Sequence, residues 1–413
     1  MKINTEPVRG TSDYLPSEMR VREHVRSVIL NSYKRYGFMQ VGTPILEDAN
    51  LLLGSDGGDN VKLIFKVLKR GEKLDLTKPN LTERDIIDIG LRYDLTVPLV
   101  RMFSNNQGKL PVPFKSIQVD YSFRADRPQK GRSRQFIQCD IDILGDPTIN
   151  AEIDILNTTA KTFVNLDFNE FVIKINDRRI LSSLVAYAGF AKDSEPDVCI
   201  CLDKMDKLSK DELCSEMLSR GYKKENIDKL LSAIEKIKTG GLVETLNYGA
   251  DPVVVAEAQT VLDSVNTLAG KNAKYKAVYD VSIVRGQGYY TGLVYEVYID
   301  GFRGACGGGG RYNNMVEKMT GKSVPAVGFG LGFEPTCMLY AERHSGQTSK
   351  TIAVLYGAQD NITDVLKFIE GFEAGIVGSA IMQKKNIGFQ LESLKANGFT
   401  HFCKFGENII KEI

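Results

Sequence analysis

The sequence predicts an α+β protein in which a strand-rich part is interrupted by a helical segment and followed by a small α/β domain. Three observations predict this organisation. Between Tyr121 and Gly145, two runs of alternating residues flank a polar loop, as in a long β-hairpin. Residues 179–271 are rich in Lys, Glu, Leu and Ser at helical spacing and contain no strand-like run. After residue 349, strand and helix patterns alternate, which is typical of a small α/β domain.

Length and composition limit the class of protein. A chain of 413 residues should hold two or three domains, and a content of 43% hydrophobic and 25% charged residues is typical of a soluble globular protein. No apolar run approaches the ~20 residues of a membrane span, and the first ten residues lack the pattern of a signal peptide. We therefore expect a cytoplasmic protein with no membrane partner. Seven scattered cysteines favour reduced thiols, and only three histidines argue against a His-rich metal site.

The N-terminal part predicts a helix and two strand-like segments. Apolar residues recur every four positions from Ser17 to about Tyr36, and a strand broken at Pro44 follows. Further on, residues 91–99 predict a strand end that leads into a helix, where Asp94 and Thr96 share one face. Taken alone, Asp94 is better explained as a cap of this helix than as a ligand group.

The loop of the central hairpin is strongly basic. From Arg124 to Arg134 it carries five positive side chains and one acid, a charge of +4 on eleven residues in a chain whose net charge is +1. Guanidinium groups bind phosphates in bidentate geometry, so the loop is suited to an anionic ligand. A solvated hairpin tip is the ordinary alternative.

The second half contains two unusual glycine-rich stretches. RGQGYYTG at residues 285–292 leads into a predicted strand at Leu293–Tyr298, and four consecutive glycines follow at Gly307–Gly310. Consecutive glycines let a ligand or a neighbouring strand approach the backbone closely, although a flexible turn is their usual structure. Residues 326–334 predict a glycine-punctuated strand that enters a helix.

Taken together, these stretches resemble the motifs of class II aminoacyl-tRNA synthetases in the form found in histidyl-tRNA synthetases. FRxD with GRxRxFxQ in the hairpin resembles motif 2, and RGxGYYTG with GGGGRY resembles the two histidine signatures. The helix and strand before Pro44 resemble motif 1, and residues 326–334 resemble motif 3. The resemblance implies an antiparallel sheet with flanking helices for a catalytic domain at 1–178 and 273–344. It also implies a helical insertion at 179–272 and a shortened anticodon-binding-like α/β domain at 349–413.

The same resemblance implies a histidine–tRNA ligase that acts as a homodimer. Its substrates would be L-histidine, ATP with Mg²⁺, and the histidine-specific tRNA; the sequence indicates no Mg²⁺ ligands. The first step would form histidyl-adenylate and pyrophosphate, and the second would transfer histidine to the 3′ end of the tRNA. Positioning and fixed cations can promote the first step without a general base.

The resemblance also gives individual residues expected roles. Arg124 and Arg285 would be catalytic, the first on the α-phosphate and the second between the carboxylate and that phosphate. The ATP-binding residues would be Arg124, Asp126, Arg132 and Phe136. The histidine-binding residues would be Asp94, Thr96, Gln138, Asp142 and Arg285, together with Tyr289, Tyr290 and Tyr312 around the imidazole. Arg127 and Gln129 would touch the acceptor end of the tRNA.

Three positions depart from the family pattern. Pro335 stands where motif 3 has the arginine that grips the γ-phosphate, Asn313 stands where the family often has Asp, and Gly288 where many members have Asp. Two alternatives therefore stay open. One is a non-catalytic histidine-binding paralogue, such as a regulatory subunit of ATP phosphoribosyltransferase. Pro335 and the short C-terminal domain favour it, whereas the intact basic loop, Asp126 and Phe136 do not. The other is an RNA-binding module without ligase activity, which leaves the tyrosines and acids unexplained.

Overall fold

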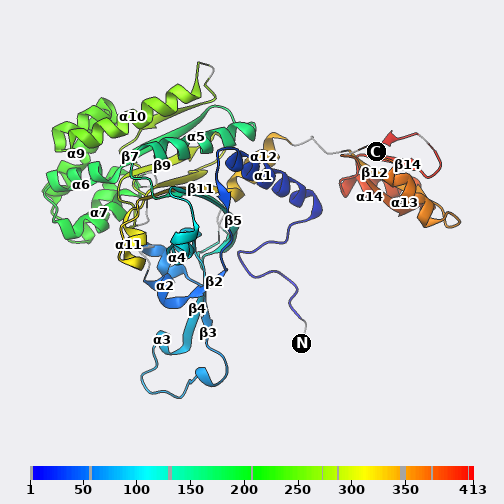
Figure 1. The fold of residues 1–413 in the computed structure, drawn as a ribbon, viewed down its shortest axis with the longest axis horizontal. Helices are drawn as coiled ribbons and strands as arrows, with labels where there is room; N and C mark the ends of the chain where they lie inside the picture. Colours follow the sequence, from blue (N-terminus) through cyan, green and yellow to red (C-terminus); the bar gives the residue numbers. More distant parts are fainter. Residues whose placement is uncertain are drawn as a thin grey trace. The chain divides into compact units, whose positions relative to one another are not determined.

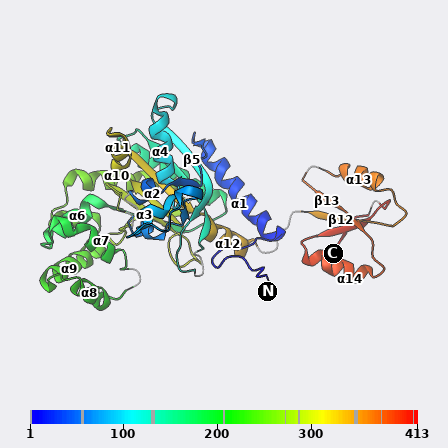
Figure 2. The same ribbon diagram turned by 90° about the horizontal axis from the view of Figure 1, so that it is seen from below.

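The computed structural model describes residues 3–54, 58–128, 133–205, 208–271, 273–285, 288–344, 350–373, 375–407 and 409–413. It divides into two compact units (Figures 1 and 2). The first comprises residues 1–12 and 25–339, and the second comprises residues 13–24 and 340–413. Within the described ranges, every helix is too short or too polar to span a bilayer.

An eight-stranded sheet forms the centre of the first unit, with the strand order β1-β5-β6-β11-β10-β9-β7-β8. The strands are β1 Met39–Gln40, β5 Phe114–Phe123, β6 Gln135–Leu144, β7 Phe171–Asp177, β8 Tyr275–Tyr279, β9 Leu293–Tyr298, β10 Gly307–Arg311 and β11 Ala326–Gly332. The outer pairs β1–β5 and β7–β8 are parallel, and the pairs between them are antiparallel. The antiparallel core of this sheet agrees with the fold class that the sequence predicts.

The central hairpin is longer than its alternating sequence suggested. Ten residue pairs, from Phe114↔Leu144 to Phe123↔Gln135, join β5 to β6. Successive side chains of a strand point to opposite faces, so β6 separates its apolar residues from its polar ones. Ile141 and Ile143 are buried on one face, and the polar residues that alternate with them belong to the other.

Helices cover both faces of the large sheet. On the apolar face lie α5 (Asn150–Asn165) and α10 (Pro252–Ala269), as Figure 1 shows, and Lys115 of β5 pairs there with Asp154 of α5 at 2.6 Å. On the other face, α4 (Thr96–Asn106) packs against α11 (Asn314–Thr320). Their apolar side chains share one buried cluster with the sheet, which includes Leu99, Phe103, Phe114, Val294 and Val316. The remaining helices here are α1 (Pro16–Arg35) and α12 (Phe333–Arg343), and the boundary between the units falls within each of them.

A small antiparallel sheet lies beside α4. Its strands are β2 (Leu46–Asp48), β4 (Ile87–Leu91) and β3 (Lys66–Leu68), in the order β2-β4-β3, with the short helices α2 (Ala49–Leu53) and α3 (Glu83–Ile86). Arg101 of α4 donates two hydrogen bonds of 2.7 Å to the carboxylate of Glu47 in β2. This bidentate pair ties the small sheet to α4, and so to one wall of the site described below.

Helices alone fill the segment between β7 and β8, as the sequence predicts for the part that the structure describes. They are α6 (Arg178–Tyr187), α7 (Glu195–Leu202), α8 (Lys210–Ser219), α9 (Lys224–Gly240) and α10, with 3-10 turns at Lys192–Ser194 and Leu242–Tyr248. Figure 2 shows α6 to α9 gathered in one group. Lys210 pairs with Glu235 and Lys224 with Asp228 on exposed faces, so these lysines fit the ordinary explanation of solvated helix surfaces.

The second unit contains a four-stranded sheet in the order β13-β12-β14-β15. Its elements are β12 Thr351–Tyr356, α13 Ile362–Glu370, β13 Val377–Met382, α14 Ile387–Ala396, β14 His401–Lys404 and β15 Lys411–Glu412. The first three strands are parallel and β15 is antiparallel to β14. The sequence predicted these three strands and both helices but not β15, because two residues are too few to show a period. The predicted linker at 345–348 lies outside the described residues.

Candidate active site

A row of polar side chains on β6 faces glycines on β11. Gln138, Asp140 and Asp142 alternate along β6, and their partners in register are Gly332, Gly330 and Gly328. A Cβ atom at Gly328 would lie 2.0 Å from Oδ1 of Asp142, and one at Gly330 would lie 2.9 Å from Oδ1 of Asp140. The GFGLG alternation of β11 therefore clears the space that the two carboxylates occupy.

The four glycines of β10 continue this side-chain-free surface. They form a strand paired on both sides, with β9 and β11, and the usual interpretation of a flexible turn is wrong here. A Cβ at Gly309 would lie 1.9 Å from the carbonyl oxygen of Gly328, and one at Gly310 would lie 2.5 Å from that of Leu293. Only glycine fits these positions, because the neighbouring backbones are too close for any side chain. Two adjacent strands thus form the floor of a trough.

Asp140 is a site residue that the sequence reasoning missed. It lies between Gln138 and Asp142 on the same face of β6, and both acids are buried. Burial raises the pKa of Asp140 well above its ordinary value, and the nearby carboxyls of Asp142 and Asp94 raise it further. The period-two spacing that placed Gln138 and Asp142 together also includes residue 140, so the sequence contained the signal.

The structure is compatible with both roles that the sequence left open for Asp94. Its Oδ1 accepts a hydrogen bond of 3.2 Å from the backbone N–H of Val97 at the start of α4, so the expected cap is present. Among the described residues, its buried Oδ2 has no hydrogen-bond partner. Burial raises the pKa of Asp94 to about 6, against the opposing effect of that cap and of Arg124. Thr96, in the first turn of α4, lines the same cleft as Asp140 and Asp142.

Three tyrosines close the end of the trough. The ring centroids of Tyr289 and Tyr290 are 4.8 Å apart, and those of Tyr289 and Tyr312 are 5.9 Å apart. All three belong to the apolar cluster of α4 and α11 and also line the cleft. The three tyrosines therefore pack in the core and also line the cleft, so neither interpretation excludes the other. Neither Tyr289 nor Tyr290 lies in a strand, since β9 begins at Leu293.

Two arginines supply positive charge. Arg124 donates from Nε to the carbonyl oxygen of Tyr93 at 3.0 Å, and its guanidinium lies 5.1 Å from the ring centroid of Phe136. Burial lowers the pKa of Arg124, while the nearby Asp94 acts in the opposite direction. Arg285 pairs through Nη1 with Glu296 at 2.8 Å. Burial opposes the charged form of Arg285, but Tyr290 and Glu296 outweigh it and raise the pKa.

The basic loop is only partly described. Arg132 and Gln129, the expected ATP and tRNA contacts, lie outside the described residues, as do Gly286 and Gln287 of the first histidine signature. The backbone carbonyl oxygen of Asp126 accepts a hydrogen bond of 3.1 Å from Nε of Arg134, and the Arg127 side chain is exposed. The structure thus brings together the expected histidine-binding residues and Arg124 with Phe136, while the loop tip stays a prediction from sequence.

Pro335 fits the first turn of α12 without strain. This turn needs no backbone N–H from residue 335, since its first N–H groups have no partner inside the helix. The preceding Glu334 accepts from the backbone N–H of Ile137 at 3.3 Å and joins α12 to β6. The fold therefore accommodates the proline, and the cation expected at this position is missing.

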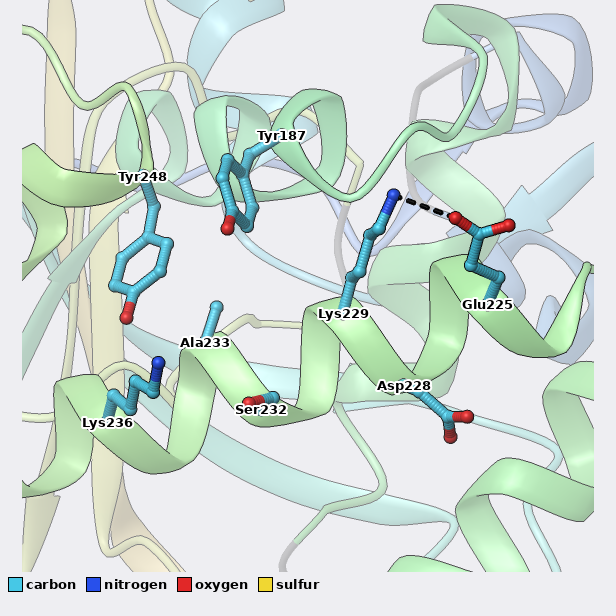
Figure 3. A pocket seen from close by; sticks show the side chains of 8 residues that line it. All are labelled: Tyr187, Glu225, Asp228, Lys229, Ser232, Ala233, Lys236 and Tyr248. Carbon is cyan, nitrogen blue, oxygen red and sulfur yellow. Dashed lines mark ion pairs between the residues drawn. The ribbon is translucent and has the colours of Figure 1, made fainter.

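Two cavities differ in their fit to these residues. The cleft lined by Asp140, Asp142 and the tyrosines has a volume of about 20 Å³, roughly the space of one water. A larger cavity of about 330 Å³ lies against α9 and contains none of the expected site residues (Figure 3). Its rim mixes both charges, for example in the pair Lys229–Glu225 at 3.0 Å. The convergent carboxylates and tyrosines identify the smaller cleft as the candidate site.

Comparison with known proteins decides the family. The family model described as histidyl-tRNA synthetase matches residues 10–335, a span that includes every site residue named above. The chain belongs to the histidyl-tRNA synthetase family.

Relatives of this family match the chain over most of its length. The histidine–tRNA ligase of Leifsonia xyli is 39% identical over 341 residues, which cover 79% of this chain and 78% of the relative. The probable histidine–tRNA ligase of Tropheryma whipplei is 34% identical over 417 residues, which cover 96% and 94%. These matches confirm the family that the motifs indicated.

Solved structures agree with the fold. The histidyl-tRNA synthetase from Nostoc sp. is 23% identical, covers 97% of this chain and 91% of its own, and has a TM-score of 0.75. A protein from Bacillus halodurans, described as an ATP phosphoribosyltransferase regulatory subunit/histidyl-tRNA synthetase, has a TM-score of 0.74 at 16% identity. Such distant likenesses show the fold alone. The relatives at 34–39% identity are named as ligases, so the regulatory alternative is not favoured.

Proposed function

We propose that this chain is a histidine–tRNA ligase, which activates histidine with ATP and transfers it to its tRNA. Beyond the family membership, the observation that carries this proposal is the glycine-floored trough. Buried acids on β6 and just before α4 lie along one wall, and Arg285 lies above β10, two strands away from β6. Two strand spacings are roughly 10 Å, a separation suited to an amino acid with a cationic and an anionic end.

Acidic, aromatic and basic residues of the site bind different parts of the substrates during activation. Asp94, Asp142, Gln138 and Thr96 hold the α-ammonium, because a desolvated cation needs carboxylate partners. Tyr289, Tyr290 and Tyr312 surround the imidazole, and their hydroxyls hydrogen-bond its nitrogens. Arg285 and Arg124 bring the carboxylate to the α-phosphate and stabilise the charge that develops between them. Asp126, Phe136 and Arg132 hold ATP, and Arg127 and Gln129 meet the acceptor end of the tRNA.

In this proposal, Mg²⁺ binds together with ATP and not at a site of its own in the protein. Among the described residues, no group of three or more His, Cys, Asp or Glu side chains could hold a metal ion. Mg²⁺ in nucleotide sites keeps several waters and binds mainly through substrate phosphates, so the lack of a protein cage is compatible with its use. The ion would neutralise part of the phosphate charge. We assign it no ligands in this chain.

The organisation of the molecule follows from the same proposal. Residues 1–178 and 273–344 form the catalytic domain, 179–272 the insertion and 349–413 the anticodon-binding-like domain. The enzyme acts as a homodimer in the cytoplasm.

Histidine-dependent ATP–pyrophosphate exchange tests the function directly. We expect exchange with histidine and none with other amino acids, followed by charging of the histidine-specific tRNA. An absence of exchange in a protein that still binds histidine would instead support the regulatory alternative. Binding of neither histidine nor ATP would contradict both.

A further inference from the structure

A row of residues in register across neighbouring strands connects the site on β6 to the strands β9 and β7 of the same sheet. Glu296 on β9 is in register with Gly308 on β10 and with Lys174 on β7. Gly308 is in turn in register with Gly330, the glycine beside Asp140. Side chains of such a row point to one face of the sheet. The two glycines therefore separate two acids, Asp140 on one side of the trough and Glu296 on the other.

Arg285 crosses the trough floor to reach Glu296. Its Nη1 pairs with Oε1 of Glu296 at 2.8 Å, and both side chains are mostly buried, at 23% and 15% exposure. A Cβ at Gly308 would lie 2.6 Å from this Nη1, so the guanidinium rests on a position that only glycine can occupy. Among the described residues, the buried Nε of Arg285 has no acceptor. The Nε–H donor is thus available to a further anionic group.

The backbone of Arg285 is also held in an unusual conformation. Its φ of +61° lies in the left-handed region, which a residue with a long side chain rarely adopts. Such conformations persist only where the surrounding structure fixes them. The ion pair with Glu296 holds the guanidinium end of the Arg285 side chain.

Glu296 is itself held by a second layer. Its other oxygen, Oε2, accepts a hydrogen bond of 2.7 Å from the hydroxyl of Tyr298. Lys174 lies 4.6 Å from the ring centroid of Tyr298 and pairs with Asp280 at 2.8 Å. Both carboxylate oxygens of Glu296 are therefore engaged, and charges alternate from Arg285 to Asp280.

If Glu296 loses its carboxylate, the next acid along the cross-strand row, beyond Gly308 and Gly330, is Asp140. Asp140 is buried, and one of its oxygens has no hydrogen-bond partner among the described residues. An arginine drawn to Asp140 would lie across Gly308 and Gly330, where the substrate is expected. A competing carboxylate on the far side prevents this collapse.

We infer that Glu296 is a positioning residue for histidine activation, which holds the Arg285 guanidinium over Gly308 and away from Asp140. The inference rests on the proposed function for the role of Arg285. Glu296 touches no reacting atom and acts through the arginine. Tyr298 supports it by fixing the orientation of the carboxylate.

Kinetics of the exchange reaction test this role. Glu296→Gln keeps the shape of the side chain but removes its charge, and Glu296→Leu also removes the hydrogen-bond acceptor. We expect kcat/KM for histidine to fall at least about tenfold in the first variant and further in the second. KM for ATP should change less than KM for histidine, because ATP is held mainly by the basic loop. The kcat/KM for histidine of Tyr298→Phe should lie between the values of the natural protein and of Glu296→Gln.

A matched control separates this role from a general loss of packing. Asp154→Asn removes another partly buried carboxylate of an ion pair, with Lys115, on the opposite face of the same sheet. We expect melting temperatures of Asp154→Asn and Glu296→Gln to fall by similar small amounts, with exchange slowed only in the second. Equal exchange in both variants, or a loss in Glu296→Gln fully explained by unfolding, would overturn the inference.

A crystal structure of Glu296→Gln gives a readout that does not depend on activity. We expect the Arg285 guanidinium to leave Gly308 and to approach Asp140. An arginine that keeps its place over Gly308 in this variant would contradict the inference, even if the natural protein showed no exchange. Absence of exchange in the natural protein would count against the proposed function alone.

Discussion

The hydroxyl of Tyr312 donates a hydrogen bond of 2.6 Å to Oδ1 of Asp142, across 170 positions of sequence. This bond closes the trough where the imidazole pocket is expected. Asp142 is only 3% exposed, and burial raises its pKa to about 7, although the bond from Tyr312 acts in the opposite direction. A carboxyl that titrates near neutrality in the empty site becomes fully charged when a cationic ligand arrives.

Asp142→Asn should stabilise the protein at pH 8 while it weakens histidine binding. The folded-state pKa is raised above the unfolded value, so the contribution of Asp142 to stability is present below pH ~4 and is lost as the pH rises through 7. At pH 8 the substitution removes a buried charge, and we expect a gain on the order of 1–3 kcal/mol in the free energy of unfolding. Thermal unfolding between pH 4 and pH 8 checks this. A variant that is less stable than the natural protein at pH 8 would contradict it.

Gly328→Ala should abolish histidine binding with little change in secondary structure. Its Cβ would lie 2.0 Å from the Asp142 carboxylate, so the acid must move out of the trough. Gly108→Ala is the control, because no atom lies within 4 Å of a Cβ there. We expect histidine affinity, measured by calorimetry, to fall at least about a hundredfold in Gly328→Ala only. Unchanged affinity would show that the substrate does not use this carboxylate.

Gly10→Ala should raise KM for ATP. The carbonyl oxygen of Gly10 accepts from the N–H of Arg134 at 2.7 Å, and the carbonyl oxygen of Arg134 accepts from the N–H of Arg124 at 2.9 Å. A Cβ at Gly10 would lie 2.7 Å from Pro128 and 2.9 Å from Arg134, so it would displace both arms of the basic loop. We expect an increase in KM for ATP of roughly threefold or more, with KM for histidine nearly constant.

Gly37→Ala is a matched control for that substitution. Gly37 has φ of +80°, close to the +89° of Gly10, but no atom lies within 4 Å of its Cβ position. The two variants share the backbone strain of a left-handed alanine. Only the collision with the loop differs. A similar KM for ATP in both would refute a role of the N-terminal segment in supporting the loop.

Pro335→Arg should strengthen ATP use. Loss of one charge-assisted phosphate contact costs on the order of 2–4 kcal/mol where it acts in the transition state. We expect the natural protein to catalyse exchange slowly and the arginine variant to raise kcat/KM for ATP at least about tenfold. Pro335→Ala shows whether removal of the proline alone has this effect. Exchange that is equally fast in all three would mean that this enzyme does not need a cation at residue 335.

Local pattern predicted how several residues of the expected site would be arranged before any fold was known. Alternation along β6 placed Gln138 and Asp142 on one face, and the same period would have added Asp140. The cap role of Asp94 was also visible locally, because an acid before a helical run accepts from the first free N–H groups. The sequence alone therefore indicated the main elements and the family, and the family resemblance predicted the residues around the expected histidine.

Tertiary structure alone decided which strands became neighbours and what each glycine does. Four glycines have no side chains and hence no period, so only the partners on β9 and β11 show that they form a strand rather than a turn. In the sequence, nothing distinguishes Glu296 from other residues of a short strand. Only the fold places the Arg285 guanidinium over Gly308 and beside Glu296. Such relationships depend on the cross-strand register of segments far apart in sequence. That register is fixed when the sheet packs between its helices, and no local pattern contains it.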